Sequence, residues 1–338
     1  MSWRLCGVLL CCLYTTAGVA DDIYRESRPH MGTQVTIMVR LEAGVSKAQA
    51  VIAVDKAFRE IDRVEQLMSE WLPASEVSKI NQQAGSAVSV SKETLTLLET
   101  SKQVGEWTDG AFDVTWAAMR GLWHFGNDTF EPPSTAARRT VRRLVDYEKL
   151  QLDKQSQTVR LAVPGMAIGV GGIAKGYGVE RALSVLQASG LQHVVVSAGG
   201  DMAVRGRKLD RQWHVGIRHP RQPNNLLGTI AIADEAVVTS GDYERYREHD
   251  GVRYHHIIDP RTGMPARGTQ SVTIVARDAT IADALATGVF VLGPTAGLAL
   301  IERLPNVEGL VVTATGEIKM TAGLQGRFWP KPSEPKTP

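Results

Sequence analysis

Residues 169–201, GVGGIAKGYGVERALSVLQASGLQHVVVSAGGD, carry the strongest indication of the fold class. Glycines open a helix that we expect to run from Ile173 to about Ser189 and to end at Gly190, a residue suited to a helix C-terminus. The apolar run at 194–196 then predicts a strand. The glycine spacing departs from the dinucleotide-binding pattern G-x-G-x-x-G, because no suitable acidic residue or parallel strand–helix–strand spacing follows. This order of elements predicts α/β (mixed α+β) structure that is not a Rossmann fold.

The rest of the chain alternates between strand and helix patterns. Polar and apolar residues alternate at 31–39, which predicts a half-buried strand. We expect one helix to begin at Ser46, which with Gln49 resembles a capping box, and another to begin at Ser91 and end near 108–110. Further along we predict a surface segment at 127–143, a strand at 270–275, helices at 280–292 and 296–304, and a strand at 310–313. The pattern favours mixed sheets flanked by helices.

Composition places the chain among globular proteins. It has 338 residues, of which 43% are apolar and 22% are charged. Lys and Arg number 38 and Asp and Glu 36, which leaves a formal net charge of +2. Disorder requires low hydrophobicity together with high net charge, so this chain can bury a core. The charge balance implies no nucleic-acid partner, and 32 glycines without a three-residue period indicate tight turns rather than collagen.

The first twenty residues have the features of a signal peptide. An almost wholly apolar run occupies 5–14, and small residues at 18–20 offer a peptidase site. The run is too short for an ordinary transmembrane helix. Cys6, Cys11 and Cys12 all lie in this region, so cleavage would leave a mature chain without thiols.

We therefore predict a cleaved signal peptide at 1–20, a domain at 21–338 and a periplasmic location. A lipid anchor on Cys11 or Cys12 is less favoured, because Leu10 is larger than the small residue that usually precedes such a cysteine. An uncleaved membrane anchor is the remaining alternative.

Two glycine-rich segments could bring the backbone close to a ligand. At 169–177 the free N–H groups of the helix start would face an anion such as phosphate, and Lys175 would add a positive charge. A tight turn accounts for the same glycines equally well. At 197–201 a strand is followed by two glycines and Asp201, which suits either a close ligand contact or a hairpin.

Two groups of polar residues have a spacing that would suit catalysis or metal binding. His255, His256 and Asp259 lie on a turn fixed by proline and glycine, where a histidine could act as a base, although a single histidine is more often structural. Asp283 and Thr287 are four residues apart on one helix face, so their oxygens suit a hard cation such as Mg²⁺. The alternative is that Thr287 bonds to its own helix while Asp283 caps the first turn.

Eight motifs in one order make the chain resemble the ApbE-type FAD:protein FMN transferases. They are Met31-Gly32-Thr33, SEWLPASEVSKIN at 69–81, DGAFD at 109–113, GGIAKGY at 171–177, Gly199-Gly200-Asp201, AVVTSGDY at 236–243, HIIDPRTG at 256–263 and ADALAT at 282–287. No single motif is decisive, but their order holds from about Met31 to the C-terminus. The resemblance implies an ApbE-like fold and a transferase domain at 21–338.

The resemblance implies an enzyme that binds FAD and Mg²⁺. Such enzymes move FMN from FAD onto a threonine hydroxyl of an acceptor protein, leave a phosphoester-linked flavin and release AMP, and they are often exported. The implied acceptor is a flavoprotein with a threonine motif, such as a subunit of a membrane redox complex. Two alternatives share the same site: a periplasmic carrier that only binds FAD, and a pyrophosphatase that hydrolyses FAD to FMN and AMP.

The resemblance also assigns roles to residues. The Mg²⁺ ligands would be the carbonyl of Gly172 and the side chains of Asp283 and Thr287. The FAD site would be lined by Met31, Trp71, Ala111, Phe112, Asp113, Gly169, Lys175 and Ile258. His256, supported by Asp259, would lie near the transferred phosphoryl group as a base or as an orienting group.

Two positions depart from the family pattern. Gly169 stands where the family usually has an aspartate, so a carboxylate expected to contact FAD is missing. Trp71 stands where tyrosine is frequent, which keeps a stacking surface but changes the hydrogen bonding. The missing carboxylate favours the carrier, whereas the presence of His256, Asp283 and Thr287 favours the transferase.

Overall fold

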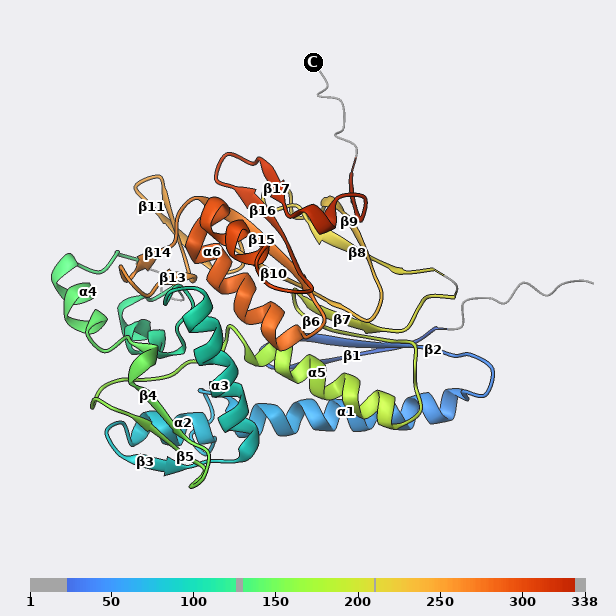
Figure 1. The fold of residues 1–338 in the computed structure, drawn as a ribbon, viewed down its shortest axis with the longest axis horizontal. Coiled ribbons are helices and arrows are strands. Elements are labelled where there is room, and N and C mark those ends of the chain that lie inside the picture. Colours follow the sequence, from blue (N-terminus) through green and yellow to red (C-terminus); the bar gives the residue numbers. More distant parts are fainter. Residues whose placement is uncertain (1–22, 126–129, 210, 332–338) are drawn as a thin grey trace, which may run out of the picture.

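The computed structural model describes residues 23–125, 130–209 and 211–331 (Figure 1). The predicted signal peptide at 1–20 and all three cysteines lie outside these ranges. Within them, helices and strands both occur along the chain, but they do not alternate throughout as expected, because only strands lie between 194 and 276. The prediction of a mixed α+β fold is therefore confirmed.

An eight-stranded sheet forms the middle layer. Its strand order is β1–β2–β6–β7–β10–β15–β16–β17, and each neighbouring pair is antiparallel. The strands are β1 (Ile23–His30), β2 (Thr33–Arg40), β6 (Val194–Ala198), β7 (Asp201–Arg205), β10 (Ala236–Gly241), β15 (Thr269–Ala276), β16 (Val307–Thr313) and β17 (Ile318–Met320). Because a Rossmann fold is built on parallel strands, this sheet excludes it.

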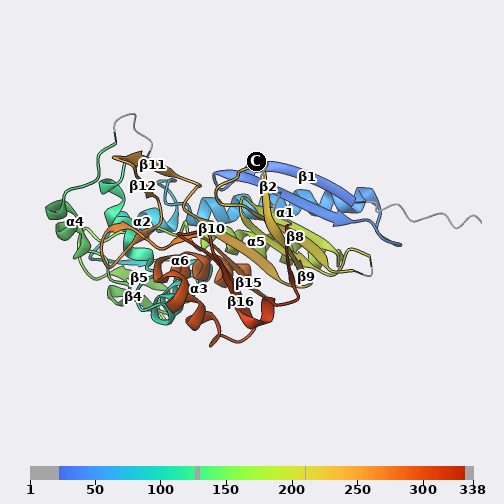
Figure 2. The same ribbon diagram turned by 90° about the horizontal axis from the view of Figure 1, so that it is seen from above.

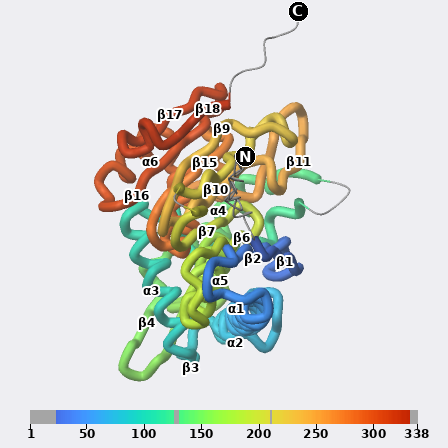
Figure 3. The backbone as a smooth tube through the Cα atoms, turned by 90° about the vertical axis from the view of Figure 1, so that its right-hand side faces the viewer, coloured from blue at the N-terminus to red at the C-terminus, as the bar shows by residue number. Residues whose placement is uncertain are grey.

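Three long helices cover one face of the sheet. They are α1 (Lys47–Met68), α5 (Ala174–Ala188) and α6 (Ala279–Ile301). Successive strand residues point to opposite faces, so Val194 and Val196 join the core under the helices, while Val195 joins a second core on the other face. Figure 3 shows α1 and α5 beside β2 and β6, on the side away from β9 (Leu226–Ile232).

A small sheet covers the opposite face. It has the order β18–β9–β8, with β8 at Trp213–Arg218 and β18 at Phe328–Pro330, and the 3-10 helix η3 (Ala322–Leu324) packs nearby. Trp213, Ile230 and Phe328 belong to the second core together with Val195. Both faces of the central sheet are therefore covered, which explains why every residue of β15 is buried.

The other elements form one end of the molecule (Figures 1 and 2). They are α2 (Glu76–Gln82), α3 (Lys92–Trp107), α4 (Thr135–Arg142), the 3-10 helices η1 (Val114–Leu122) and η2 (Tyr147–Lys149), the sheet β3 (Ala87–Ser89), β5 (Thr158–Leu161) and β4 (Leu150–Asp153), and the hairpins β11 (Tyr246–His249) with β12 (Val252–His255) and β13 (Ile258–Asp259) with β14 (Met264–Pro265). The main core continues from the central sheet into α3, through residues such as Leu98 and Val104. The two ends therefore share one hydrophobic core.

Local signals fix most helix ends. Ser46 accepts the N–H of Gln49 and Ser91 accepts the N–H of Thr94, so both predicted N-caps are confirmed. The Gln49 amide instead donates to the Ser189 carbonyl, so only half of the expected capping box forms. Gly190 ends α5 with a φ of 84°, a conformation that favours glycine.

The start of α6 shows which residue caps this helix. Asp278 accepts the N–H groups of Thr280 and Ile281 and is therefore the N-cap of α6. Asp283 lies on the second turn, so the idea that Asp283 caps this helix is wrong. Gly293, with a φ of 81°, and the following Pro294 kink α6, which accounts for the two helices predicted at 280–292 and 296–304. The helix is long and apolar enough to span a membrane, but it is mostly buried as a core helix of this fold.

Two other boundaries differ from prediction. The strand expected at 31–39 is part of a hairpin, because Met31 and Gly32 form a two-residue turn with φ values of 51° and 68°, and β2 begins only at Thr33. The described part of the segment 127–143 contains the helix α4, which has no buried residue. The segment lies on the surface as expected, but it is not wholly irregular.

Candidate active site

Lys175, in the first turn of α5, joins two buried acidic residues. Its ammonium group forms an ion pair with Asp201 at the start of β7 and lies 3.7 Å from a carboxylate oxygen of Asp283 in α6. Asp201 and Asp283 are only 1% and 2% exposed. The N–H of Gly176 donates to the other oxygen of Asp283 over 3.1 Å. One ammonium group between two buried carboxylates leaves a net negative charge, which favours the binding of a cation.

The charges in this cluster shift the pKa values of Asp283 and Lys175. Burial raises the pKa of Asp283, the Asp201 carboxylate raises it further, and Lys175 opposes the rise. Burial alone would lower the pKa of Lys175, but Asp201 and Asp283 outweigh this effect and raise that pKa above its ordinary value. Lys175 therefore stays positively charged, and a further positive charge beside Asp283 would stabilise the ionised carboxylate.

Glycines bring the start of α5, and the loop before it, against α6. A Cβ at Gly176 would overlap the carbonyl oxygen of Ala279. A Cβ at Gly172 would lie 3.2 Å from the hydroxyl oxygen of Thr287 and 3.4 Å from the Phe112 ring. The backbone at Gly172 therefore lies directly against Thr287, one turn after Asp283.

The three residues predicted to bind Mg²⁺ are thus close together. Thr287 Oγ1 lies 3.4 Å from the hydroxyl oxygen of Ser240 in β10, so its hydroxyl faces the sheet. The Gly172 carbonyl, the Asp283 carboxylate and the Thr287 hydroxyl offer only oxygen donors, the set that Mg²⁺ prefers. A side chain at Gly172 would crowd Thr287 and Phe112, and the donor set fits a hard cation.

Two neighbouring histidines have different surroundings. His255 is buried, its Nε2 lies 2.9 Å from the Ala266 carbonyl, and its Nδ1 accepts the N–H of Ile257 over 3.3 Å. Both of its nitrogens are used, which gives His255 a structural role. The Nδ1 of His256 lies 3.3 Å from the Arg245 carbonyl, which can only accept a hydrogen bond. His256 Nδ1 therefore carries the proton, and Nε2 keeps a lone pair that can accept one.

The charge state of His256 suits a base. Burial lowers the pKa of His256 to about 4, the hydrogen bond to the Arg245 carbonyl opposes this, and the charges of nearby groups that include Lys175 lower it further. At neutral pH the ring is uncharged, which is the form that can accept a proton.

Asp259 lies three residues from His256, but its carboxylate faces elsewhere. It pairs with the Arg261 guanidinium over 2.9 and 3.1 Å and also accepts the Arg261 N–H. Among the described residues no hydrogen bond joins Asp259 to His256. In this structure the Arg245 carbonyl orients the His256 ring, and Asp259 fixes the turn between β13 and β14.

Met31 and Phe112, two of the predicted FAD-site residues, lie around the start of α5. The Met31 sulfur would be 2.8 Å from a Cβ at Gly178, so this side chain packs over the second turn of α5. The Phe112 ring lies beside Gly172, and Ala111 is buried next to it. These residues therefore border the start of α5, which carries Lys175.

Asp113 and Ile258 lie deeper in the fold. Asp113 accepts the N–H and hydroxyl of Thr115 over 2.7 and 2.6 Å, and its second oxygen accepts the Tyr147 N–H over 3.0 Å. Burial raises the pKa of Asp113 to about 6, and these hydrogen bonds oppose the rise. Its side chain therefore accepts backbone hydrogen bonds at the start of both η1 and η2. Ile258 packs with Met119 in a small separate core.

Trp71 presents an exposed ring close to Gly169. Trp71 comes shortly after the end of α1, and it is 69% exposed. The Arg120 guanidinium carbon lies 4.7 Å from the ring centre. Arg120 also pairs with Glu70 over 2.7 Å, and the other Glu70 oxygen accepts the Val170 N–H over 3.2 Å. One face of the indole is covered by a cation, and much of its remaining surface is open to a planar ligand.

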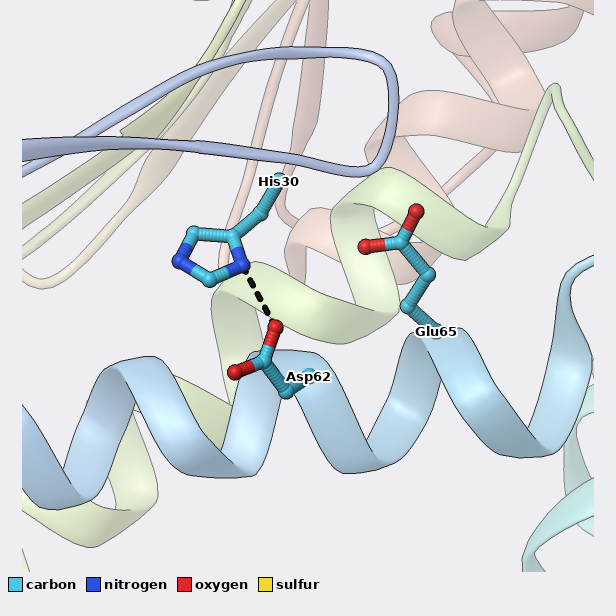
Figure 4. A group of neighbouring side chains, drawn as sticks. All are labelled: His30, Asp62 and Glu65. Carbon is cyan, nitrogen blue, oxygen red and sulfur yellow. Dashed lines mark ion pairs between the residues drawn. The ribbon is translucent and has the colours of Figure 1, made fainter.

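The turn at Met31 is anchored to α1 by acidic side chains. Figure 4 shows His30 and Asp62 pointing toward each other, and the two atoms of their ion pair lie 2.7 Å apart. Glu65, one helical turn after Asp62, accepts the Met31 N–H over 2.9 Å. These contacts hold Met31 in its left-handed conformation at the edge of the site.

Sequence reasoning missed several residues of this region. Asp201 belongs to a quoted motif, and the Gly199–Gly200 hairpin turn between β6 and β7 delivers it to Lys175. Ser240 is likewise in a quoted motif, but its contact with Thr287 depends on sheet packing. Glu70 is also in a quoted motif, at 69–81, whereas Arg120 is in none, and their ion pair joins two separate segments.

Comparisons with known proteins agree on one family. The model of the ApbE family matches residues 31–311. An FAD:protein FMN transferase of Treponema pallidum is 33% identical over 96% of this chain and 95% of its own length, and one of Vibrio cholerae is 32% identical over 82% and 83%. The crystal structure of the ApbE protein of Thermotoga maritima superposes with a TM-score of 0.82 at 34% identity, and covers 90% of this chain and 99% of its own. The structure of the flavin transferase ApbE of Vibrio cholerae superposes with a TM-score of 0.80 at 28% identity, and it also covers 90% of this chain and 99% of its own.

Proposed function

The chain belongs to the ApbE family and is an FAD:protein FMN transferase, and from this premise we propose that it transfers FMN to a threonine hydroxyl in a Mg²⁺-dependent reaction that releases AMP. The threonine oxygen forms a bond to the phosphorus of the FMN half of FAD. The bond from that phosphorus to the bridging oxygen breaks, and this oxygen leaves with AMP. The hydroxyl proton passes to a base.

One observation supports this proposal most directly. Three oxygen donors, from Gly172, Asp283 and Thr287, lie together beside Lys175, and His256 is close enough to Lys175 for that charge to lower its pKa. A cation site and an ammonium group can neutralise the charge of a pyrophosphate, and an uncharged imidazole can accept a proton, which are functions that phosphoryl transfer uses.

Lys175 and the start of α5 would bind the pyrophosphate. Phosphoryl transfer depends mainly on placing the reactants and on neutralising charge, and both need fixed positive groups. Lys175 is held by Asp201, so its ammonium group does not have to be ordered when the substrate binds. The exposed part of this side chain, 31% of its surface, leaves it accessible to a ligand.

Gly172, Asp283 and Thr287 would hold the metal through oxygen atoms. Bound there, Mg²⁺ would neutralise the pyrophosphate oxygens and make AMP a better leaving group.

His256 would accept the proton of the attacking threonine. A threonine hydroxyl is a poor nucleophile at neutral pH, and a base within reach raises its reactivity. The Arg245 carbonyl fixes the proton on Nδ1, so the lone pair on Nε2 is the one available. The lowered pKa keeps His256 ready to accept a proton at neutral pH.

We also propose that the acceptor is an exported or membrane-bound flavoprotein and that this enzyme acts in the periplasm. The support is the signal-peptide pattern at 1–20, with its apolar run and its small residues before the cleavage position. A periplasmic enzyme meets the exposed domains of membrane redox complexes there.

The test combines the chain from Asp21 onward with FAD, Mg²⁺ and an acceptor domain that bears a threonine motif. We expect the acceptor to gain the mass of one FMN moiety, to fluoresce in a denaturing gel and to remain unmodified when EDTA is present. The matched control is the same acceptor with its threonine changed to valine, which keeps the shape but removes the hydroxyl.

Other outcomes identify the alternatives. Free FMN and AMP without a modified acceptor would contradict the proposal and indicate an FAD pyrophosphatase. FAD recovered intact from the protein would indicate a carrier. Modification that continues in EDTA would contradict the proposed metal dependence.

A further inference from the structure

The space beside Gly169 is filled by a carboxylate from another segment. A Cβ at Gly169 would lie 2.6 Å from Glu70 Oε2, 2.9 Å from Arg120 and 3.0 Å from Ala117. The distance from this Cβ to Glu70 Oε2 is close to the distance between Cβ and the carboxylate oxygens within an aspartate side chain. From the turn after α1, Glu70 therefore reaches the place where an acidic side chain at position 169 would end.

Glu70 is held firmly in this place. Its side chain is only 8% exposed, one oxygen pairs with Arg120 over 2.7 Å, and the other accepts the Val170 N–H over 3.2 Å. Burial raises the pKa of Glu70, while the charge of Arg120 lowers it. Each carboxylate oxygen has two lone pairs, so Glu70 retains acceptor capacity for a ligand.

The surroundings of Glu70 point to FAD as that ligand. Arg120, which binds Glu70, also lies over the exposed ring of Trp71, so the carboxylate and the stacking surface form one unit. A carboxylate accepts hydrogen bonds but donates none, and it repels phosphate. The partner must therefore be a donor on FAD: a hydroxyl of its sugar chains, the flavin ring N–H or the adenine amino group.

We infer that Glu70 binds such a donor group of FAD and replaces, from a different segment, the carboxylate that Gly169 lacks. This inference rests on the proposed FAD site, and it makes Glu70 a substrate-binding residue. It also explains why glycine is needed at 169, since a larger side chain would collide with Glu70.

The first test is the affinity for FAD of Glu70→Gln, measured by equilibrium dialysis in EDTA so that the metal site does not contribute. We expect binding at least about tenfold weaker, because a hydrogen bond to a charged acceptor is lost. The matched control is Glu76→Gln, in the same segment, where the carboxylate contacts Ser91 instead; its FAD affinity should equal that of the parent. Melting temperature without FAD, read in parallel, separates a loss of binding from a loss of fold.

The second test removes the carboxylate at position 70 and places one at position 169. Glu70→Ser should weaken FAD binding, and adding Gly169→Asp should restore it to within about threefold of the parent, whereas adding Gly169→Asn should not. The asparagine has the same size but no charge, so this pair separates the carboxylate from simple space filling. Gly169→Asp alone should bind FAD more weakly, because its side chain meets Glu70.

Two results would overturn the inference: an FAD affinity of Glu70→Gln equal to that of the parent, or equal rescue by asparagine and aspartate. Either would leave Glu70 as a partner of Arg120 only. Failure of the proposed function has a different signature, because the parent would then bind FAD but not modify the acceptor.

Discussion

At the scale of single residues, the contacts of the ring nitrogens distinguish His256 from His255. His255 uses both nitrogens within the fold, whereas His256 keeps one lone pair. We expect His256→Ala to slow FMN transfer about 100- to 10,000-fold, the usual contribution of a general base, with little change in FAD affinity. Single-turnover transfer followed by in-gel fluorescence measures this loss. His214→Ala, on β8 in the small sheet, is the control that should keep full transfer.

The pH dependence of the same residue is a separate prediction. The pKa of His256 is lowered to about 4, chiefly by burial, and His255, Arg245 and Lys175 all lower it further. Protonation removes the lone pair, so transfer should fall as the pH drops through about 4 and should stay level between pH 5 and 7. The pH profile of kcat/KM for FAD reports this value for the free enzyme. An acid limb near 6.5, the ordinary value for histidine, would contradict the proposed environment.

The sequence predicted the chemistry of single residues better than their contacts. Lys175, Asp283 and Thr287 could be placed in one site because their motifs have a recognised order and because residues four apart share a helix face. The ion pair of Asp201 with Lys175 and the pair of Glu70 with Arg120 join separate segments, which no local pattern encodes. For the same reason the orientation of His256 by Arg245, rather than by Asp259, emerges only from the fold.

At the scale of elements, the contact between α5 and α6 holds the site together. Because a Cβ at Gly176 would overlap the Ala279 carbonyl, we expect Gly176→Ala to push the helices apart, to cost about 1–3 kcal/mol of unfolding free energy and to weaken transfer. Urea unfolding and transfer rates measure the two effects. Gly121→Ala, in η1, has no atom within 4 Å of the added Cβ and should change the unfolding free energy little. Equal stability of the two variants would contradict the close packing.

Elements with strong local signals were predictable, and those stabilised by distant contacts were not. Ser46, Ser91 and Gly190 mark helix ends through their own backbone and side-chain chemistry. The sequence of strand β1 is largely polar and gives no strand pattern. This edge strand is stabilised by pairing with β2 and by ion pairs to α1 such as Arg28–Asp55. The short strands of the small sheet are likewise defined by packing on the central sheet.

At the scale of the whole molecule, the site joins the two ends of the fold. Met31 and Lys175 come from the layers of the central sheet, whereas Phe112 follows α3 at the other end, and one core connects them. The order of helices and strands made the mixed α+β class predictable. The antiparallel strand order was not, because it depends on pairings between segments far apart in the chain, such as β2 with β6, where Val35 lies opposite Ala198.

Because the site spans both ends, its ligands should stabilise the whole molecule. We expect saturating FAD to raise the melting temperature by about 5 °C, and Mg²⁺ to add a further increase when FAD is present. Differential scanning fluorimetry with FAD, Mg²⁺, both or neither measures these increments. In Asp283→Ala the increment from Mg²⁺ should disappear, since the buried carboxylate that we propose as a metal ligand is lost, while part of the FAD increment remains. A Mg²⁺ increment that survives in Asp283→Ala would place the metal elsewhere, and an FAD increment that is absent in the parent would contradict the site as a whole.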